Sequence, residues 1–327
     1  MHISLLLSNT KPGHEVIVPT VSFIAPINAI KYCNASPVFM DVDDYLNIDI
    51  KKTISFLENE TIIKNNLTYN KRTKKRISAI IVVHVFGNLV DINPLIKICK
   101  KRNIDLIEDG AESFGSYYNN LKKKKHAGTI GKFGCLSFNG NKIITCGGGG
   151  AILTQNKKLA YKARYLVTQA KNDSVYFVHD NVGYNYKMTN LHAAVGTAQI
   201  NKIKKILVNK KKIFDFYCKQ SNSIRGVSMI KSPNYCVSNN WINLLKIDDK
   251  IYKQSVKQLI SFFTKHQIQV RPVWFLNHLQ KPYKNSQSYK ITNAKKLINK
   301  ILCLPSSSNL KKSQIQKIFN LLKEKKN

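Results

Sequence analysis

The sequence predicts an α/β fold: a mostly parallel sheet sandwiched by helices, followed by a smaller α+β C-terminal domain. Over the first two-thirds of the chain, short apolar runs alternate with helical patterns. This order is typical of a parallel sheet covered on both faces. From about residue 222, shorter strands mix with amphipathic helices. We therefore expect a large domain over residues 1–205 and a small domain over residues 206–327.

The expected elements of the large domain alternate along the chain. Strands are expected at 15–19, 37–42, 77–84 and 104–108, and helices at 23–32 and 93–103. Pro94 lies in the first turn of the second helix, a position that favours proline. Ligands of such sheets bind beyond the carboxyl ends of the strands, so the residues that follow each strand are the first candidates for a site.

The small domain is expected to follow a long polar helix over residues 190–218. A strand at 240–245, an amphipathic helix at 256–266 and a short strand at 267–270 are expected after it. Residues 59–76 have the least regular pattern in the chain.

The chain is strongly basic, with 53 Lys and Arg residues against 18 Asp and Glu residues and a net charge of +35. The lysines are spread along the chain together with many Asn and Ile residues, as a coding bias toward A and T produces. Basic blocks at 71–76 and 122–125 fall in expected loops, without the aromatic residues that stack on nucleic-acid bases. We expect no nucleic-acid partner, and salt-dependent DNA binding would contradict this. The positive field can still attract an anionic substrate.

The pattern of apolar and cysteine residues indicates a cytoplasmic protein. No run of about 18 uncharged apolar residues is present, so no membrane span is expected. The first residues lack the basic region and cleavage site of a signal peptide. The seven cysteines are scattered and contain no CxxC pair, which is typical of a reducing compartment. We expect no metal site.

Lys142 is the residue that most clearly indicates chemistry. It follows Ser137 by five positions and precedes the glycine run Gly147–Gly150. About thirty residues upstream, Asp109 ends an apolar strand, and a carboxylate buried there needs a cation or hydrogen-bond donors. A lysine that forms a Schiff base and an aspartate that pairs with the pyridinium nitrogen are what pyridoxal phosphate (PLP) requires.

Each of these residues also has a plain structural alternative. Asp109 alone is compatible with a helix cap, Ser137 with a small polar strand residue, and the glycines with the tip of a hairpin. The glycine run is not a P-loop, because neither Lys-Ser nor Lys-Thr follows it. The combined spacing favours a PLP site over these separate alternatives.

Six motifs occur in one order along nearly the whole chain. They are Val16–Phe23, Pro37–Asp43, Val83–Gly87, Ile107–Ser113, Ser137–Lys142 and Gly183–Asn190. Together they resemble the DegT/StrS-type sugar aminotransferases, which are fold-type I PLP-dependent transferases. The four-glycine run and segments 168–171, 178–180 and 271–274 also resemble the LegC-type branch, which aminates nucleotide-linked keto sugars on the way to legionaminic acid and similar sugars.

The resemblance implies a role for each residue that matches a family motif. Lys142 would bind the PLP aldehyde, and Asp109 would pair with the pyridine nitrogen. Phe23 matches the aromatic residue that stacks on the ring, although a core position at a helix start is the alternative. Glu112 falls beside the ring, and Ser137 would bind the phosphate.

The resemblance also implies a partner and a substrate region. Asn185 would reach the phosphate of the PLP in the neighbouring subunit, so a homodimer with shared active sites is expected; a turn residue is the alternative. Arg271, His84 and His278 are candidate substrate contacts, each with an equally good structural alternative.

The reaction that the resemblance implies is a transamination. Glutamate would donate the amino group, and a nucleotide-linked 4-keto-6-deoxy sugar of surface-polysaccharide or nonulosonic acid biosynthesis would accept it. Lys142 would move the proton between the substrate carbon and the cofactor. Related PLP dehydratases have histidine where Lys142 stands, so the lysine argues against dehydration.

One departure from the family concerns the start of the chain. Residues 1–7 resemble the middle of a helix that relatives begin well inside their chains, after a Gly-Thr turn that holds the PLP phosphate. We expect that this segment is missing and that the first helix, without its cap, frays. An inactive or partner-binding truncated paralogue is therefore the alternative to an active enzyme.

Overall fold

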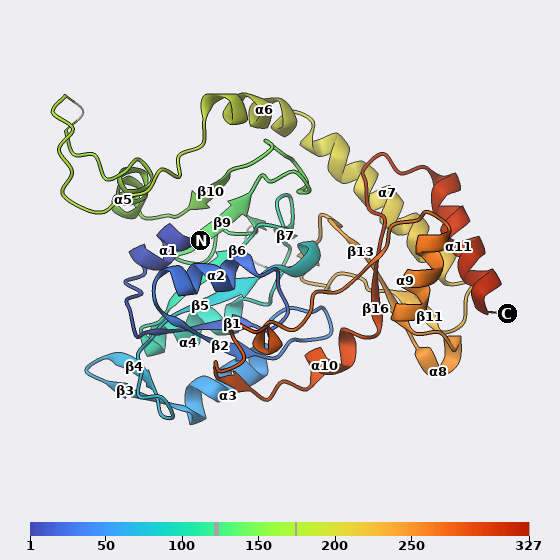
Figure 1. Ribbon diagram of the computed structural model, residues 1–327, viewed down its shortest axis with the longest axis horizontal. Helices are drawn as coiled ribbons and strands as arrows, with labels where there is room; N and C mark the ends of the chain where they lie inside the picture. Colours follow the sequence, from blue (N-terminus) through green and yellow to red (C-terminus); the bar gives the residue numbers. More distant parts are fainter. Residues whose placement is uncertain (121–123, 174, 327) are drawn as a thin grey trace.

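The computed structural model describes residues 1–120, 124–173 and 175–326, and it confirms the predicted fold class. A seven-stranded sheet forms the centre of the large domain, in the order β10-β9-β6-β5-β1-β2-β15 (Figure 1). Neighbouring strands are parallel except for β9 and β10. The strands are β1 (Glu15–Pro19), β2 (Ser36–Met40), β5 (Ile77–Val83), β6 (Asp105–Asp109), β9 (Phe133–Ser137), β10 (Gly150–Leu153) and β15 (Ser288–Tyr289).

Helices cover both faces of the sheet because its central strands are apolar on both sides. In β1, Val16 and Val18 pack into the core on one face, while Ile17 packs into the core on the other. This alternation follows from the two-residue period of a strand. The first layer contains α1 (His2–Leu7), α2 (Ala25–Tyr32) and α5 (Lys157–Val167), and the second contains α3 (Ile50–Asn59) and α4 (Asn93–Arg102).

Residues 59–76, which have the least regular sequence pattern, contain a β-hairpin. Strands β3 (Thr61–Lys64) and β4 (Leu67–Asn70) pair in antiparallel register. The two turn residues, Asn65 and Asn66, have φ values of 50° and 58°. Asparagine tolerates this left-handed conformation better than most residues, so the Asn-Asn pair was a hairpin signal in the sequence.

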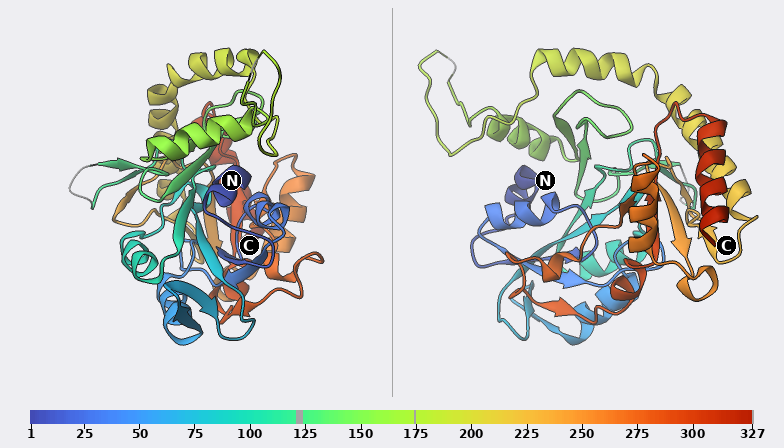
Figure 2. Two further views of the ribbon diagram at one scale, coloured as in Figure 1. Left: turned by 90° about the vertical axis from the view of Figure 1, so that its left-hand side faces the viewer. Right: turned by 45° about the vertical axis from the view of Figure 1, so that its right-hand side comes forward.

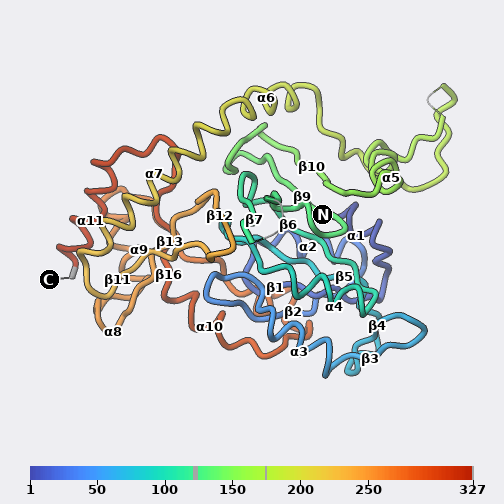
Figure 3. Tube along the Cα trace, turned by 180° about the vertical axis from the view of Figure 1, so that it is seen from behind, coloured from blue at the N-terminus to red at the C-terminus, as the bar shows by residue number. Residues whose placement is uncertain are grey.

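The predicted helix over residues 190–218 is two helices, α6 (Asn190–Ile200) and α7 (Ile203–Ser221), with a break at Asn201 and Lys202. Together they carry the chain from above the large sheet to the small domain, as Figure 3 shows from behind. In the part of the chain that the structure describes, no helix is long and apolar enough to cross a membrane.

The small domain is built on an antiparallel sheet with the strand order β11-β13-β16-β14. Apolar residues of this sheet and of α7, α9 and α11 form one separate core. Figure 2 shows α7 and α11 side by side at the outer edge. The elements are β11 (Val227–Met229), β13 (Asn243–Ile247), α8 (Asp249–Tyr252), α9 (Val256–Lys265), β14 (Arg271–Pro272), β16 (Ile301–Leu304) and α11 (Lys312–Lys326). A strand thus occurs at Arg271–Pro272 and not at 267–270 as predicted.

The chain returns to the large domain before it completes the small one. Strand β15 pairs with β2 as the outermost strand of the large sheet, and α10 (Asn293–Leu297) begins at the buried carboxylate of Asp41. The predicted division at residues 205 and 206 therefore does not describe this returning segment. The remaining elements are the short sheet of β7 (Tyr117–Tyr118), β8 (Lys125–His126) and β12 (Cys236–Val237), and the 3-10 turns η1 (Val85–Gly87) and η2 (Asn277–Leu279).

Candidate active site

The register of three strands brings Asp109, Ser137 and the loop of Lys142 to one edge of the large sheet. Asp109, the last residue of β6, pairs with Cys135 of β9. Ser137 lies two residues further along β9 and pairs with Gly150, the first residue of β10. Lys142 lies in the connection between β9 and β10. The carboxyl ends of parallel strands, where ligands are expected, therefore carry the predicted residues.

The glycine run forms the return of the Lys142 loop into β10. Gly147 and Gly149 have φ values of 81° and 93°, a region that disfavours other residues. At Gly150, a Cβ atom would lie 2.3 Å from the carbonyl oxygen of Leu136 on the paired strand. Glycine is therefore required for backbone conformation and for close strand approach, and the run is not simply a loose hairpin tip.

Asp109 is a buried carboxyl group that suits a cationic partner. Its Oδ1 accepts a hydrogen bond from the backbone N–H of Ala111 at 3.0 Å. Burial raises the pKa of Asp109, and the positive charge of Lys142 opposes this shift. A protonated pyridine nitrogen would supply the compensating charge that a buried carboxylate requires.

Glu112 is a second buried carboxyl group at the same edge. Its Oε2 accepts a hydrogen bond from the backbone N–H of Phe86 at 2.7 Å. Burial raises the pKa of Glu112 to about 8, and the Lys142 charge again opposes the shift. Lys142 is thus close enough to act on the charge of both carboxyl groups, and Asp109 acts on the charge of Glu112.

Lys142 contacts a residue that sequence reasoning missed. Its Nζ lies 4.3 Å from the centroid of the Trp241 ring, within the range of a cation–π interaction. The Trp241 Nε1–H donates a hydrogen bond to the carbonyl oxygen of Asn141 at 2.7 Å. Trp241 lies just before β13 of the small domain, and its neighbours in the sequence indicate only a strand.

Phe23 lies in the connection between β1 and α2 and is 55% exposed. Helix α2 begins at Ala25, two residues later than predicted, so Phe23 is outside the helix. Its ring meets that of Trp274 edge to face, with 6.4 Å between the centroids. Exposure of a large aromatic residue at this edge argues against the alternative of a core position and suits a residue that stacks on a planar ligand.

Ser137 and Asn185 occupy accessible positions that leave their predicted roles open. Ser137 is half-buried, and its Oγ accepts a hydrogen bond from the N–H of Asn139 at 3.4 Å. Asn185 is exposed and forms an isolated antiparallel bridge with Thr168.

His84 does not have the predicted geometry of a substrate contact. It is fully buried, and its Nε2 lies 3.0 Å from Oε2 of Glu108. Its Nδ1 accepts a hydrogen bond from the Val90 N–H at 3.2 Å, so Nε2 carries the proton and donates to Glu108. Both ring nitrogens thus have hydrogen-bond partners within the protein, and neither is free to bind a substrate.

His278 and Arg271 differ in accessibility. His278 is buried, and its Nδ1 lies 2.7 Å from Oγ1 of Thr20, directly after β1. Arg271 is exposed on β14, where it pairs with Cys303 of β16. Among the three candidate substrate contacts, Arg271 is the one whose charged group is open to a ligand.

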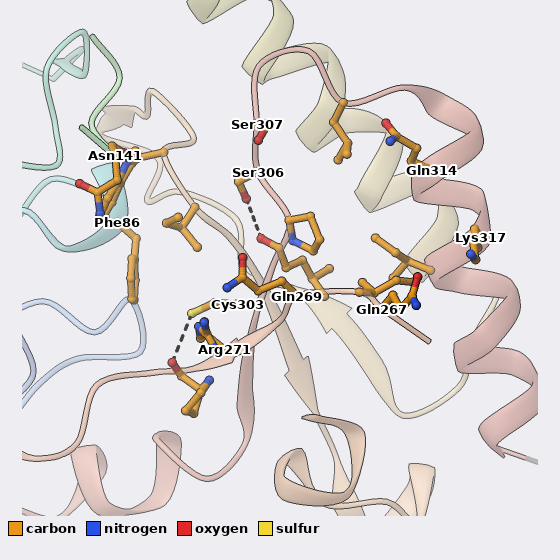
Figure 4. Close-up of a pocket in the computed structure, with 18 of the residues that line it drawn as sticks. Phe86, Asn141, Gln267, Gln269, Arg271, Cys303, Ser306, Ser307, Gln314 and Lys317 are labelled. Atoms are coloured by element: carbon orange, nitrogen blue, oxygen red, sulfur yellow. Dashed lines mark hydrogen bonds between the residues drawn. The ribbon is translucent and has the colours of Figure 1, made fainter. Parts of the chain in front are cut away.

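A cavity of about 750 Å³ separates the two domains beside this edge (Figure 4). Phe86 and Asn141 line it from the large domain, and Arg271 and Lys317 line it from the small domain. Burial raises the pKa of Cys303 on the same wall to about 12, with a further contribution from the charge of Glu112. The cavity therefore lies beside the loop of Lys142, and its small-domain wall carries two basic residues, Arg271 and Lys317.

These residues fit PLP. Asp109 offers a buried carboxyl group with a raised pKa, and Lys142 lies close enough to act on its charge. Phe23 offers an exposed ring at the same edge. Lys142 would hold the aldehyde and Asp109 the pyridine nitrogen, which is the donor set that this cofactor needs.

A sequence model of the DegT/DnrJ/EryC1/StrS aminotransferase family matches residues 1–323. The chain belongs to this family. It is a PLP-dependent aminotransferase, as its motifs predicted. The same match supports an aminotransferase over the nucleic-acid alternative, which rested on charge alone.

Relatives of known sequence agree with this assignment. The chain is 33% identical over 325 residues to a GDP-perosamine synthase of Escherichia coli O157:H7, covering 99% of this chain and 82% of the relative. It is 30% identical over 327 residues to EpsN of Bacillus subtilis, covering 98% of this chain and 80% of the relative. A GDP-perosamine synthase of Caulobacter vibrioides is also 30% identical, over 326 residues, with 98% and 82% covered.

Solved structures show the same fold at lower identity. An aminotransferase of this family from Brucella abortus has a TM-score of 0.87 and 23% identity, with 99% of this chain and 82% of that chain covered. PseC of Helicobacter pylori, an aminotransferase involved in pseudoaminic acid biosynthesis, has a TM-score of 0.84 and 20% identity, with 99% and 83% covered.

The comparisons do not support two of the narrower expectations. The family match begins at residue 1, so it gives no support to a missing N-terminal segment or to the inactive paralogue derived from it. The first helix, α1, has no side-chain cap, as predicted, but Ile3, Leu5 and Leu7 are buried in the core. The relatives also give no support to the legionaminic-type assignment.

Proposed function

We propose that this enzyme transfers the amino group of glutamate to a nucleotide-linked 4-keto-6-deoxy sugar, with its PLP attached to Lys142. The observation that carries the proposal is the position of Lys142: its charge acts on the buried Asp109 and Glu112, beside an interdomain cavity. When bound, PLP supplies an electron sink that stabilises negative charge on the substrate carbon.

The residues of the chain have separate tasks in this reaction. Lys142 Nζ holds the cofactor and, once released, moves a proton to and from the substrate carbon. Asp109 keeps the pyridine nitrogen protonated, because burial disfavours a carboxylate without a cationic partner. Phe23 supports the ring by stacking, and Ser137 binds the phosphate.

The cavity supports a nucleotide-linked acceptor. Its volume of about 750 Å³ lies within the usual range for small-molecule sites, about 300–1,000 Å³. Arg271 and Lys317 give its small-domain wall a positive charge, and a guanidinium group binds phosphate oxygens in a bidentate manner. We propose that Arg271 binds the diphosphate of the nucleotide sugar, whereas His84 only supports the sheet edge.

The relatives favour a GDP-linked sugar over the legionaminic-type substrate. Two of them are GDP-perosamine synthases with 30–33% identity over nearly the whole of this chain. A legionaminic-type precursor stays the competing substrate, on the resemblance of segments 168–171 and 271–274. All seven cysteines are free, and we propose that the reaction takes place in the reducing cytoplasm.

We further propose that the enzyme is a homodimer in which Asn185 serves the neighbouring active site. Helix α6, which follows Asn185, has Gly196 as its one buried residue. Leu191 of α6 is 83% exposed, and Val182 is 82% exposed. Apolar surface of this kind is usually covered by a partner, and a second copy would cover it and bring Asn185 to its cofactor.

The test of this proposal is the substitution Lys142→Ala. We expect the purified wild-type enzyme to show the visible absorbance of lysine-bound PLP and to convert glutamate to 2-oxoglutarate when a nucleotide-linked keto sugar is supplied. Lys142→Ala should lose both. Unchanged cofactor absorbance in this variant would refute the role of Lys142.

The substrate is identified by a panel of GDP-, UDP- and CMP-linked keto sugars, with mass spectrometry of the aminated product. A GDP-linked product supports the assignment. A product with another nucleotide refutes the GDP preference but leaves the aminotransferase reaction intact.

A further inference from the structure

Lys210, in the middle of α7, is a buried lysine that the reaction described above does not use. Its side chain is 5% exposed. Burial lowers the pKa of Lys210 to about 8, with no contribution from a carboxylate among the described residues. A buried ammonium group is costly unless hydrogen bonds compensate for its lost hydration. A buried lysine at this position does not contribute to solubility or surface charge, so a role within the structure is expected.

The ammonium group of Lys210 binds two backbone carbonyl groups of the small domain. It donates to the carbonyl oxygen of Trp241 at 2.7 Å, and it also donates to the carbonyl oxygen of Ser306. Trp241 precedes β13 and Ser306 follows β16, so both lie where the sheet ladder has ended. Tyr217, two turns further along α7, donates to the carbonyl oxygen of Pro305 at 2.9 Å.

Both carbonyl groups belong to walls of the interdomain cavity. Trp241 and Ser306 line it, and Ser306 is labelled in Figure 4. The Ser306 Oγ also accepts hydrogen bonds from the N–H and the Nδ2 of Asn243, both at 2.9 Å. Lys210 thus joins the start of β13 to the end of β16 at the point where the two meet the cavity.

The same contacts lead from Lys210 to Lys142. The backbone of Trp241 is held by Lys210, and its indole N–H donates to the carbonyl oxygen of Asn141 at 2.7 Å. Lys142, the next residue, has its Nζ 4.3 Å from the indole centroid. Phe86 stacks on the same indole, with 6.2 Å between the centroids.

We propose that Lys210 is a positioning residue, which fixes Trp241 and thereby sets the place of the PLP-binding Lys142 against the cavity wall. The inference rests on the role proposed for Lys142. A lysine suits the task because three N–H donors on one nitrogen can bind carbonyl groups from two separate segments. An apolar residue of similar length would fill the space but leave both carbonyl groups without this donor.

The test compares Lys210→Met with Lys210→Arg and with the matched control Lys212→Met. Methionine keeps the length of the side chain and removes the donors, whereas arginine keeps the charge and the N–H groups. Lys212 lies on the same helix and is exposed. It therefore controls for the loss of a positive charge from α7.

The first readout is tryptophan fluorescence of the enzyme without PLP. The chain has two tryptophans, so a Trp274→Phe background leaves Trp241 as the reporter. Without the hydrogen bond from Lys210, the indole of Trp241 should become more accessible to solvent. Lys210→Met should therefore raise the acrylamide quenching constant of Trp241 by about twofold or more. Lys210→Arg should restore the lower value, and Lys212→Met should leave it unchanged.

The second readout is the holoenzyme. Loss of the indole from its place above Lys142 should lower the pH midpoint of the cofactor absorbance by up to about one unit. The two carboxyl groups on whose charge Lys142 acts, Asp109 and Glu112, are kept in every variant. A misplaced Lys142 should lower kcat by about tenfold or more, as small displacements at a reacting centre do.

A merely structural role for Lys210 would give a different result. Lys210→Met would then unfold at a lower temperature, but its quenching, pH midpoint and kcat would equal those of Lys212→Met, and the proposal would be overturned. Should Lys210→Met fail to fold, Trp241→Phe keeps a ring and removes the donor to Asn141. An unchanged pH midpoint in Trp241→Phe would also overturn the proposal.

The failure of this inference differs from a failure of the proposed function. If Lys142 does not bind PLP, Lys142→Ala keeps the cofactor absorbance, whatever the Lys210 variants do. If only the inference fails, Lys142→Ala loses the absorbance and the Lys210 variants behave like the control.

Discussion

At the scale of single residues, the site combines two buried carboxyl groups with the nearby cation of Lys142. Burial raises the pKa of both Asp109 and Glu112, and Lys142 opposes the shift at each. The three groups lie at one edge because the strands and the Lys142 loop end there. A cationic ring placed beside these carboxyl groups would favour their ionised forms, which burial disfavours.

The raised pKa of Glu112 gives a prediction about stability and pH. The pKa rises from 4.5 in the unfolded chain to about 8, so protonated Glu112 favours folding below pH 4.5, and this stability is lost as the pH rises through about 8. In the enzyme without PLP, Glu112→Gln should therefore become more stable than the wild type at alkaline pH, by about 2 kcal/mol at about pH 9. Urea denaturation at about pH 5 and about pH 9 measures this.

Glu58, which is exposed on α3, provides the control. Glu58→Gln should show the same pH dependence as the wild type. A stability difference between Glu112→Gln and the wild type that stays constant between the two pH values would contradict the prediction.

At the scale of elements, the loop between β9 and β10 depends on backbone that only glycine allows. Gly150 pairs with Ser137, and the strands approach so closely that any side chain would meet the Leu136 carbonyl group. The loop that carries Lys142 thus returns into β10 through a position where only glycine fits. This geometry also explains why a glycine run stands so near Lys142 in the sequence.

Replacement of Gly150 by alanine tests the importance of this close approach. The new Cβ would lie 2.3 Å from the Leu136 carbonyl oxygen, so Gly150→Ala should lower the free energy of unfolding by about 1–3 kcal/mol. At Gly140, in the same loop, a new Cβ would meet no other segment of the chain within 4 Å, and Gly140→Ala should change stability by less than about 0.5 kcal/mol. Equal stabilities for the two variants in urea denaturation would contradict this account.

At the scale of the whole molecule, two connections hold the arrangement together. Helices α6 and α7 carry the chain over the large sheet to the small domain, and the returning segment brings β15 and α10 back (Figure 1). The cavity lies between the two domains that these connections join. Asp41 binds the start of α10 in the returning segment. Helix α6, in the other connection, has an exposed apolar surface.

Asp41 is the buried acid that fixes the returning segment. It pairs with Lys52 and accepts backbone hydrogen bonds from Thr292, Asn293 and Ala294. Burial alone would raise the pKa of Asp41, but Lys52 and these donors outweigh burial and lower the pKa to about 2. Its stabilising effect is therefore present above pH 3.8 and is lost as the pH falls through about 2.

Asp41→Asn should cost about 3 kcal/mol or more at neutral pH, because Lys52 loses its buried partner. The deficit relative to the wild type should shrink below about pH 3.8, where the wild-type carboxylate also begins to gain a proton. The surface pair of Lys132 and Asp105, with 36% and 28% exposure, supplies the control: Asp105→Asn should cost less than about 1 kcal/mol. Urea denaturation at about pH 7 and about pH 3 compares the three proteins, and an Asp41→Asn protein no less stable than Asp105→Asn would contradict the role of Asp41.

The exposed face of α6 gives a prediction about assembly. Leu191→Asp places a charge on a residue that is 83% exposed in the single chain, and it should shift the enzyme from dimer to monomer because interface cores exclude charges. Ile63 of the β3–β4 hairpin, at the far end of the large domain in Figures 1 and 3, is 48% exposed. Ile63→Asp should leave the dimer intact. Equal masses for the wild type and both variants in sedimentation equilibrium would refute this interface.

Much of the fold could be read from the chain because its signals are local. Short apolar runs predict the buried strands β1 and β5, and a proline in the first turn predicts the start of α4. Each signal lies within a few residues of the element that it predicts. The β3–β4 hairpin was missed although Asn65 and Asn66 were a usable signal. The break between α6 and α7 and the position of β14 depend on packing, and nothing in the local pattern marks them.

The same division holds for the site. Lys142, Asp109 and Ser137 could be chosen from the sequence because strand ends, glycine positions and motif order are written in it. Trp241 and Lys210 could not, because each acts through a contact between segments far apart in the chain: Trp241 with Asn141, and Lys210 with Trp241 and Ser306. His84 was wrongly given a substrate contact, since its pairing with Glu108 is a matter of register between β5 and β6.

The sequence by itself determined the α/β class and the PLP-dependent chemistry, and it singled out Lys142 as the candidate lysine, because these depend on residue type and spacing. The tertiary structure alone decided which part of the small domain lies beside that lysine and which residues line the cavity between the domains. Such features depend on how the two domains and the returning segment pack against each other. The free energy of this packing comes from many contacts between residues far apart in the chain, which no local pattern records. A buried lysine on α7 is one such contact, and its influence on Lys142 could be found only in three dimensions.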